Sequence, residues 1–244
     1  MCSQRKLIGE GKSAKIYREG NQVYKVFSDQ YPLAWIEHEA TIQNEVYTKT
    51  QLCVPQASYM KGSREIRMEY IEGCTLADRM RKEKYKQALE DLVETQASIH
   101  QYSHLNLSNA HDVFASQIQF SDLDPGLQDK ALRSLNSVEK KQVLCHFDIH
   151  FLNIMYRDDG YVILDWVNAK LGNPALDIAR TYIILKQYAQ RLASKYLKLS
   201  AKKGHFTIEE IQDAIPAMAA LRLIERDSVD FKSQLMDLIQ PSIL

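Results

Sequence analysis

The sequence predicts an α+β protein in which a small antiparallel sheet with one helix precedes a larger, mainly helical region. Residues 5–27 read as three short strands joined by turns that contain glycine. Two more strands are predicted over 56–61 and 65–70, with a helix over 32–50 before them. After Gly73 apolar residues recur at helical spacing, which indicates the change from sheet to helix.

The composition is that of an ordinary globular protein, with 45% hydrophobic and 25% charged residues among 244. The 31 basic residues balance the 31 acidic ones, which argues against a nucleic-acid partner, because such binding depends on neutralising phosphates. No run approaches the roughly 20 apolar residues of a membrane span. The four cysteines stand apart without a CxxC pair, so neither a zinc ribbon nor a disulfide framework is predicted. We expect a cytoplasmic protein without a membrane partner.

One charged residue falls on the apolar face of the helix predicted over 32–50. That face is formed by Trp35, Ile42 and Val46. Glu39 lies on the same stripe, where a carboxylate is costly unless it is paired. Lys25, on the preceding strand, is the predicted partner. The alternative is a glutamate at the edge of an amphipathic face.

The most informative stretch is 143–166, which contains three short apolar runs typical of buried strands. These runs are 143–145, 154–156 and 161–164. The Asp159-Gly160 pair between the last two predicts a tight hairpin turn, since both residues tolerate a positive φ.

Polar side chains stand at the ends of these strands. Asp148 and Asn153 follow the first run, and Asp165 follows the last. We expect the three to converge. The amide and carboxylate oxygens of Asn153 and Asp165 suit Mg²⁺, which leaves Asp148 to accept a proton from a hydroxyl.

A transition-metal site is the alternative for this stretch, because His146, Asp148 and His150 alternate as on one strand. No cysteine or further histidine nearby completes a tetrahedral set of ligands. A zinc site would also leave Asn153 and Asp165 without a role. The magnesium interpretation is therefore preferred.

The motif His-Phe-Asp-Ile-His at 146–150, with Asn153 and then Leu-Asp-Trp at 164–166, resembles the small-molecule kinases of the aminoglycoside phosphotransferase and choline kinase family. The segment 171–177 resembles their Gly-x-Pro-x-x-Asp motif. The resemblance covers most of the chain and is most specific at 143–180.

This resemblance implies a two-lobed protein-kinase-like fold. Residues 1–72 would form the nucleotide-binding lobe, a small antiparallel sheet with one helix that ends in the hinge. Residues 73–244 would form the larger, mainly helical lobe, with the catalytic loop and the acceptor site.

The family resemblance also implies roles for the polar residues. Asp148 would be the catalytic base, and Asn153 and Asp165 would hold Mg²⁺. Lys25, positioned by Glu39, would bind the α- and β-phosphates of ATP or GTP.

Two further segments receive nucleotide-binding roles from the resemblance. The loop with Gly9, Gly11 and Ser13 would cover the phosphates with its backbone N–H groups. The backbone at Glu69 and Ile71 would bind the adenine edge at the hinge. A plain surface hairpin and an ordinary edge strand are the alternatives.

The rest of the chain is predicted to be helical, with one long interruption. Helices are expected over 75–81, 84–102, 127–140, 174–196, 208–223 and 229–239. Thr75 would cap the first. His100 would be a hydrogen-bonded core or cap histidine, and Asp177 would brace the catalytic loop, as its counterpart does in the family.

The interruption at 103–126 is rich in Ser, Asn, Asp and Gln and ends in an Asp-Pro-Gly turn signal at 124–126. It is part of the interval 103–142, where the family members place part of the acceptor site. The acidic residues of that interval, which could meet a cationic acceptor or could simply be solvated, are Asp112, Asp122, Asp124 and Asp129.

The predicted activity is transfer of the γ-phosphoryl group of ATP or GTP to a hydroxyl of a small molecule, such as an aminoglycoside, choline, ethanolamine or thiamine. The partners are a nucleoside triphosphate and that acceptor, whose identity the sequence leaves open together with the oligomeric state. One alternative is a non-catalytic, pseudokinase-like nucleotide-binding regulator. A protein kinase is less favoured, because Asp-Trp replaces Asp-Phe-Gly at 165–166 and no Ala-Pro-Glu motif follows.

Overall fold

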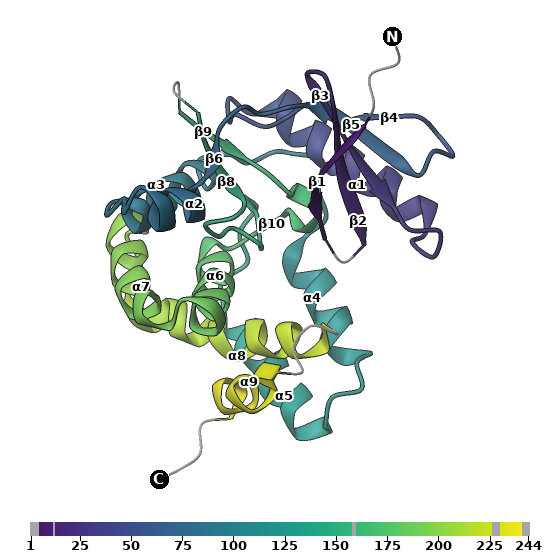
Figure 1. Cartoon of the computed structure of the whole chain (residues 1–244). Helices are drawn as coiled ribbons and strands as arrows, with labels where there is room; N and C mark the ends of the chain where they lie inside the picture. The colour runs from purple at the N-terminus through teal and green to yellow at the C-terminus, as the bar shows by residue number, and fades with distance from the viewer. Residues whose placement is uncertain (1–4, 12, 158–159, 226–229, 241–244) are drawn as a thin grey trace. The chain divides into compact units, whose positions relative to one another are not determined.

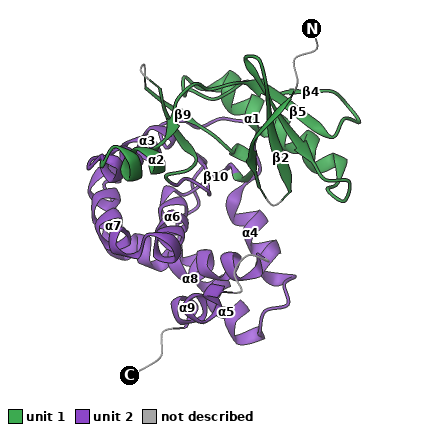
Figure 2. Ribbon diagram, in the orientation of Figure 1, with its two compact units in different colours: residues 1–84, 151–168 green, residues 85–150, 169–244 purple. Residues whose placement is uncertain are grey.

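The computed structural model describes residues 5–11, 13–157, 160–225 and 230–240 (Figure 1). The chain divides into two compact units, which Figure 2 colours separately. Unit 1 contains residues 1–84 and 151–168, and unit 2 contains residues 85–150 and 169–244. The lobe boundary expected between residues 72 and 73 stays a prediction, because packing units and kinase lobes are different divisions of a chain.

Unit 1 contains a five-stranded antiparallel sheet in the order β1-β2-β3-β5-β4. Its strands are β1 (Lys6–Glu10), β2 (Ala14–Glu19), β3 (Gln22–Phe27), β4 (Ser58–Tyr59) and β5 (Glu65–Glu69). The three strands predicted over 5–27 are confirmed, and Gly20 provides the positive φ of 59° at the turn into β3. The strand expected over 56–61 is reduced to two residues.

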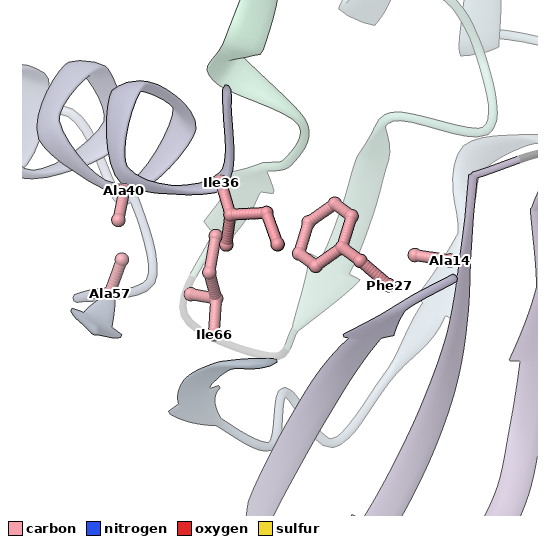
Figure 3. Packing of buried hydrophobic residues seen from close by; sticks show 6 residues of the cluster. All are labelled: Ala14, Phe27, Ile36, Ala40, Ala57 and Ile66. Carbon is pink, nitrogen blue, oxygen red and sulfur yellow. The ribbon is translucent and has the colours of Figure 1, made fainter. Parts of the chain in front are cut away.

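Helix α1 (Leu33–Lys49) covers this sheet and confirms the helix predicted over 32–50. The core beneath it joins residues of the sheet, the helix and the chain before β4 (Figure 3): Ala14, Phe27, Ile36, Ala40, Ala57 and Ile66. The prediction that Trp35 faces the core is wrong, since Trp35 is 60% exposed while Ile36 is fully buried. The buried stripe runs through Ile36 and Ala40, so Trp35 lies at its edge and packs edge-on against Tyr31.

A second, three-stranded sheet of unit 1 has the order β6-β8-β9. Its strands are β6 (Cys74–Thr75), β8 (Ile154–Arg157) and β9 (Gly160–Ile163). The strands predicted at 154–156 and 161–164 are thereby confirmed, although Asp159 of the predicted turn lies outside the described residues. Gly73 must be glycine, because a Cβ there would stand 2.1 Å from the carbonyl oxygen of Tyr156.

Two short elements complete unit 1. Helix α2 (Leu76–Lys82) begins at Thr75, whose side chain accepts a hydrogen bond from the Asp78 N–H at 3.1 Å, as predicted for this cap. The 3-10 helix η1 (Trp166–Asn168) follows β9 and buries Trp166 completely. The Trp166 indole donates to the carbonyl of Ile163 at 3.0 Å, so a polar atom inside the core is satisfied.

Unit 2 is mainly helical. Its elements are α3 (Ala88–Ile99), α4 (Ala110–Gln119), α5 (Pro125–Ser137), β7 (Val143–Cys145), β10 (Lys170–Gly172), α6 (Pro174–Tyr188), α7 (Gln190–Gly204), α8 (Ile208–Ile224) and α9 (Lys232–Ile239). Helix α8 packs against α5, α6 and α9, and α7 packs against α3 and α6. The strand predicted at 143–145 is β7, which pairs antiparallel with β10.

The loop predicted over 103–126 is partly wrong, because helix α4 forms within it. Asn109 caps this helix by accepting from the Asp112 N–H at 3.2 Å, and Phe114 and Ile118 face inward one turn apart. The expected turn at 124–126 is the start of α5, where the Asp124 side chain accepts from Gly126 N–H at 2.8 Å. Asp-Pro-Gly thus served here as a cap and a first helical turn.

The single long helix predicted over 174–196 is two helices. At Ala189 the backbone leaves the helical region, with φ −146° and ψ 48°, and α6 ends there while α7 begins at the next residue. Apolar residues continue through the break, so their periodicity gives no warning of it. No helix in the described part of the chain has the length and apolar character needed to cross a membrane.

Candidate active site

Lys25 is held between two carboxylates in unit 1. Its Nζ donates to Glu39 Oε1 at 2.6 Å, which confirms the predicted ion pair between β3 and α1. The same Nζ lies 3.3 Å from Asp165 Oδ1, at the end of the β8–β9 hairpin. The second contact, which the sequence did not predict, brings a residue implied in nucleotide binding next to one implied in metal binding.

Burial and charge act against each other in this group. Burial lowers the pKa of Lys25, but the Asp165 and Glu39 carboxylates outweigh it and hold that pKa above its usual range. Burial raises the pKa of Glu39, and the neighbouring ammonium works against that rise. The side chain of Asp165 is 39% exposed and that of Glu39 only 6%. Of the two carboxylates, Asp165 is therefore the one open to a ligand.

Asn153 and Asp165 lie at the same end of one hairpin. The strand register pairs Ile154 with Ile163, and the N–H of Leu164 donates to the Asn153 carbonyl at 2.9 Å. Asp165 directly follows Leu164 and has a left-handed backbone, with φ 63°. A non-glycine residue is uncommon there, and such strain is typical of functional positions.

The other predicted nucleotide-binding residues of unit 1 lie at strand ends. Gly9 is in β1, Gly11 donates from its N–H to the Ala14 carbonyl at 2.8 Å, and Ser13 directly precedes β2. Lys12, between them, lies outside the described residues.

The expected hinge begins at the end of β5. Glu69 is the last residue of that strand and is exposed, while Ile71 follows it and is buried. Between them, the Tyr70 N–H donates to the Asn21 carbonyl at 3.0 Å. The structure thus gives the positions of these residues, and their adenine-binding role stays a prediction.

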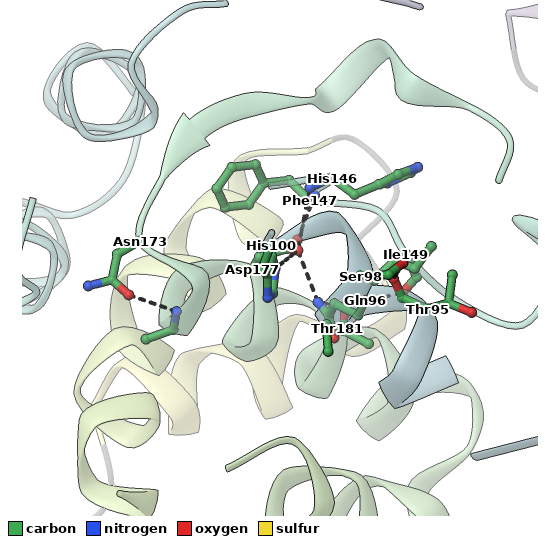
Figure 4. A network of polar contacts seen from close by, with 12 residues as sticks. Thr95, Gln96, Ser98, His100, His146, Phe147, Ile149, Asn173, Asp177 and Thr181 are labelled. Carbon is green, nitrogen blue, oxygen red and sulfur yellow. Dashed lines mark hydrogen bonds and ion pairs between the residues drawn. The ribbon is translucent and has the colours of Figure 1, made fainter. Parts of the chain in front are cut away.

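In unit 2 a buried carboxylate holds the loop that follows β7 (Figure 4). Asp177 on α6 accepts from the Phe147 N–H at 2.6 Å and from the His146 N–H at 3.4 Å. His100, the C-terminal cap of α3, lies 2.8 Å from the same carboxylate through Nε2. Both the predicted brace by Asp177 and the predicted hydrogen-bonded His100 are confirmed.

The same loop is held on the other side of Asp148. Thr181, one helical turn after Asp177, donates from Oγ1 to the Ile149 carbonyl at 3.1 Å. The Gln96 amide donates to both Asp177 and Thr181, at 3.0 and 3.3 Å. Backbone groups on both sides of Asp148 are therefore fixed to one helix.

The sequence interpretation missed three polar members of this network, Gln96, Thr181 and Tyr196. Tyr196 on α7 donates from its hydroxyl to the Gln96 side chain. A signal existed, because Gln96 stands among Leu92, Val93 and Ile99 on a buried helix face. A polar residue on such a face needs a partner.

The charge state of Asp177 follows from its surroundings. Complete burial acts to raise its pKa, but the hydrogen bonds from His100 and Gln96 and the nearby histidines outweigh burial and lower it. The carboxylate therefore stays ionised. Cys145, fully buried beside it, has a pKa well above the usual range because of burial and the Asp177 charge, so it stays a thiol.

The zinc alternative finds no support among the described residues. The metal-ligand types close enough to share an ion there are His100, Cys145 and Asp177. His146, Asp148 and His150 do not form such a group. His146 is buried, and its Nδ1 accepts from the Asp148 N–H at 3.2 Å, so it supports the loop as predicted.

Two cavities open on the surface of unit 2, of about 190 and about 310 Å³. Both are lined by residues of α3 and α7 together with His205. Neither is lined by Asp148 or by residues of β7 and β10. The first cavity is also lined by Gln96 and His100, the side chains that bind Asp177.

Comparison with known families identifies the chain. The sequence profile of a family described as the phosphotransferase enzyme family matches residues 52–202, more than half of the chain. The chain belongs to this family. Membership confirms the predicted resemblance and the predicted enzyme class, a small-molecule kinase. A search of curated protein sequences gave no significant match.

Solved structures of phosphotransferases share the fold. A thermostable mutant of aminoglycoside phosphotransferase APH(4)-Ia, in ternary complex with ADP and hygromycin B, has a TM-score of 0.68 at 12% identity, covering 97% of this chain and 92% of that one. The streptomycin-ATP-APH(2″)-IIa ternary complex has a TM-score of 0.64 at 14% identity, with coverages of 98% and 94%. A choline/ethanolamine kinase family protein from Mesorhizobium loti has a TM-score of 0.63 at 13% identity, with coverages of 98% and 89%. These likenesses confirm the predicted α+β, protein-kinase-like fold class.

Proposed function

We propose that this family member transfers the γ-phosphoryl group of ATP to a hydroxyl of a small molecule. The observation that carries the proposal is the position of Lys25 between Glu39 and Asp165, at 2.6 and 3.3 Å. Phosphoryl transfer depends on positioned charge more than on covalent chemistry by the protein. A lysine fixed by one buried carboxylate and beside one accessible carboxylate suits a nucleotide with its metal ion.

The donor is proposed to be ATP because two of the similar structures hold ADP or ATP. Lys25 would bind the α- and β-phosphates, and the backbone around Gly9, Gly11 and Ser13 would cover them. The backbone at Glu69 and Ile71 would bind the base. GTP remains open as the alternative donor.

The residues at the end of the β8–β9 hairpin fit Mg²⁺. Asn153 and Asp165 supply hard amide and carboxylate oxygens, and the partial exposure of Asp165 leaves it accessible. These two residues would hold the ion. When bound, Mg²⁺ would neutralise charge on the phosphate oxygens.

Asp148 is proposed to accept the proton of the acceptor hydroxyl. Its loop is fixed by Asp177 at the amides of residues 146 and 147 and by Thr181 at the carbonyl of residue 149. A base held in this way needs no reorganisation at the moment of transfer. Asp177, Thr181 and His146 are therefore positioning residues and not catalytic ones.

The test is acceptor-dependent release of ADP from Mg²⁺-ATP across a panel of hydroxyl compounds, run beside Asp148→Asn. Aminoglycosides, choline, ethanolamine and thiamine would form the first panel. We expect at least one acceptor to increase ADP release and Asp148→Asn to abolish the increase. Nucleotide binding without any transfer would favour the pseudokinase-like alternative, and absence of nucleotide binding would refute the kinase proposal.

A further inference from the structure

Three of the four acidic residues that the sequence offered for a cationic acceptor have a cap, an ion pair or high exposure in the structure. Asp124 caps α5. Asp129 lies 2.6 Å from the Arg133 guanidinium. Asp112 lies 3.9 Å from Lys140 Nζ and is 73% exposed. Asp124 is thus a capping group, Asp129 is ion-paired and Asp112 is largely exposed.

A lysine stands beside the 146–150 loop instead. Lys170 begins β10 and pairs in the strand register with Cys145, the residue before the loop. Its Nζ lies 5.6 Å from the centroid of the Phe114 ring on α4. The Phe147 ring packs edge-on against that same ring, with centroids 4.9 Å apart. The Lys170 ammonium and the ring of Phe147, the residue before Asp148, therefore both contact the ring of Phe114.

A second cation acts on this lysine. Arg180 lies one helical turn after Asp177, is 6% exposed, and donates to Glu225 at 2.5 Å. Glu225 also accepts from Arg222 at 2.5 Å, so two arginines share its charge. Burial and the charge of Arg180 lower the pKa of Lys170 to about 8. Two arginines thus share the charge of Glu225, and one of them, Arg180, also acts on Lys170.

We propose that the acceptor carries an anionic group, a carboxylate or a phosphate monoester, beside its reactive hydroxyl, and that Lys170 binds this group. The inference rests on the proposed function, because it names the substrate class of that reaction. A charge-assisted contact to a partly buried ammonium is stronger than a neutral hydrogen bond. An anion there also offsets the repulsion between Lys170 and Arg180.

The chemistry of the transfer is unchanged by this assignment. The bond between the γ-phosphorus and the oxygen that bridges it to the β-phosphate breaks, and a bond forms between the γ-phosphorus and the acceptor oxygen. The hydroxyl proton passes to Asp148 and then to solvent, and ADP leaves. Lys170 makes and breaks no covalent bond and acts as a specificity-determining residue.

The kinetic test compares acceptors that share a skeleton and differ in charge: glycerol, glycerate and glycerol 3-phosphate, then glucose, gluconate and glucose 6-phosphate. Each is assayed with the wild type, Lys170→Met and Lys170→Arg. Lys198→Met, a change of an exposed lysine on α7, is the matched control. The carboxylate and phosphate members of each series distinguish the two sources of the anion.

We expect an anionic member to exceed its neutral parent about tenfold or more in kcat/KM. Lys170→Met should raise the KM for that anion about tenfold with little change in kcat. Lys170→Arg should have a KM close to that of the wild type, and Lys198→Met should leave the KM unchanged. Preference for a neutral or cationic acceptor would overturn the proposal. An equal fall in kcat/KM for glycerol and for glycerol 3-phosphate in Lys170→Met would also overturn the proposal.

A binding measurement separates this proposal from the proposed function. Lysines are ¹³C-dimethylated, and the Lys170 signal is assigned by its loss in Lys170→Met. Glycerate or glycerol 3-phosphate should shift the Lys170 signal, glycerol should not, and the Lys198 signal should stay constant. No shift with either anion overturns the proposal even if the enzyme transfers phosphate. A shift without phosphoryl transfer supports the anion site and counts against the proposed kinase reaction alone.

Discussion

The ammonium of Lys25 and the carboxylate of Glu39 form a contact of 2.6 Å between a strand and a helix of unit 1. Both side chains are largely buried, with exposed fractions of 17% and 6%. A buried ion pair contributes to stability only when its geometry is good, and removal of one partner leaves the other as an unpaired buried charge. This pair therefore links the folding of unit 1 to its proposed nucleotide site.

Lys25→Met should lower both stability and activity. We expect the free energy of unfolding at pH 7 to fall by about 2–4 kcal/mol, because Glu39 is left buried without its cation. We also expect kcat/KM for Mg²⁺-ATP to fall about 10²- to 10³-fold. Urea unfolding and ADP release measure the two effects. Lys49→Met, a change of an exposed lysine at the end of α1, is the control, and an equal response in both variants would contradict the assignment.

Asp177→Asn should weaken the protein in a manner that depends on pH. The pKa of Asp177 lies below its usual value, so the ionised group adds stability above about pH 4 that is lost as the pH falls through its native pKa. We expect Asp177→Asn to lower the free energy of unfolding by about 2–4 kcal/mol at pH 7. The difference between the variant and the wild type should become smaller at lower pH. Urea unfolding at pH 7 and near pH 3 tests this. The exposed Asp129→Asn serves as control, and a difference independent of pH would count against an ionised brace.

The pH dependence of acceptor binding should report on Lys170. The titratable or charged groups on neighbouring elements include Arg180 on α6, Cys145 on β7, and His111 and Asp112 on α4. Of these, Arg180 contributes with burial to the lowered pKa of about 8. The KM for an anionic acceptor should therefore rise as the pH increases through about 8. Lys170→Arg should remove this rise, because a guanidinium keeps its charge, and persistence of the rise in that variant would assign it to another group.

Gly73→Ala should destabilise unit 1 through a steric clash. The added Cβ would stand 2.1 Å from the backbone oxygen of Tyr156, which cannot move as a flexible side chain would. We expect the free energy of unfolding of Gly73→Ala to fall by about 3 kcal/mol or more. At Gly9 a Cβ meets its nearest neighbour at 3.6 Å, so Gly9→Ala should change thermal unfolding little. Equal unfolding midpoints for the two variants would contradict the close approach at Gly73.

Much of the structure was predictable because it depends on local signals. The three N-terminal strands, α1 and the β8–β9 hairpin follow from periodicity and turn residues. The Lys25–Glu39 pair was predictable because a carboxylate on an apolar stripe requires a cation nearby. The motif at 146–150 predicted the enzyme class, which family membership confirms.

The missed features depend on contacts between distant parts of the chain. Trp35 was predicted to face the core because its spacing fits the apolar stripe, but in the structure Ile36 is buried and Trp35 is exposed. The break at Ala189 interrupts a helix pattern that continues in the sequence. The approach of Asp165 to Lys25 and of Tyr196 to Gln96 joins residues far apart in sequence, which no periodicity encodes.

The transfer reaction is tested most directly by ³¹P NMR of Mg²⁺-ATP incubated with the protein and each acceptor. We predict that the γ-phosphate signal converts into a new phosphomonoester signal with an equal amount of ADP. Asp148→Asn should slow this conversion about 100-fold or more while it still binds the nucleotide. Conversion of ATP to inorganic phosphate alone, or an unchanged rate in Asp148→Asn, would contradict the proposed reaction and its base.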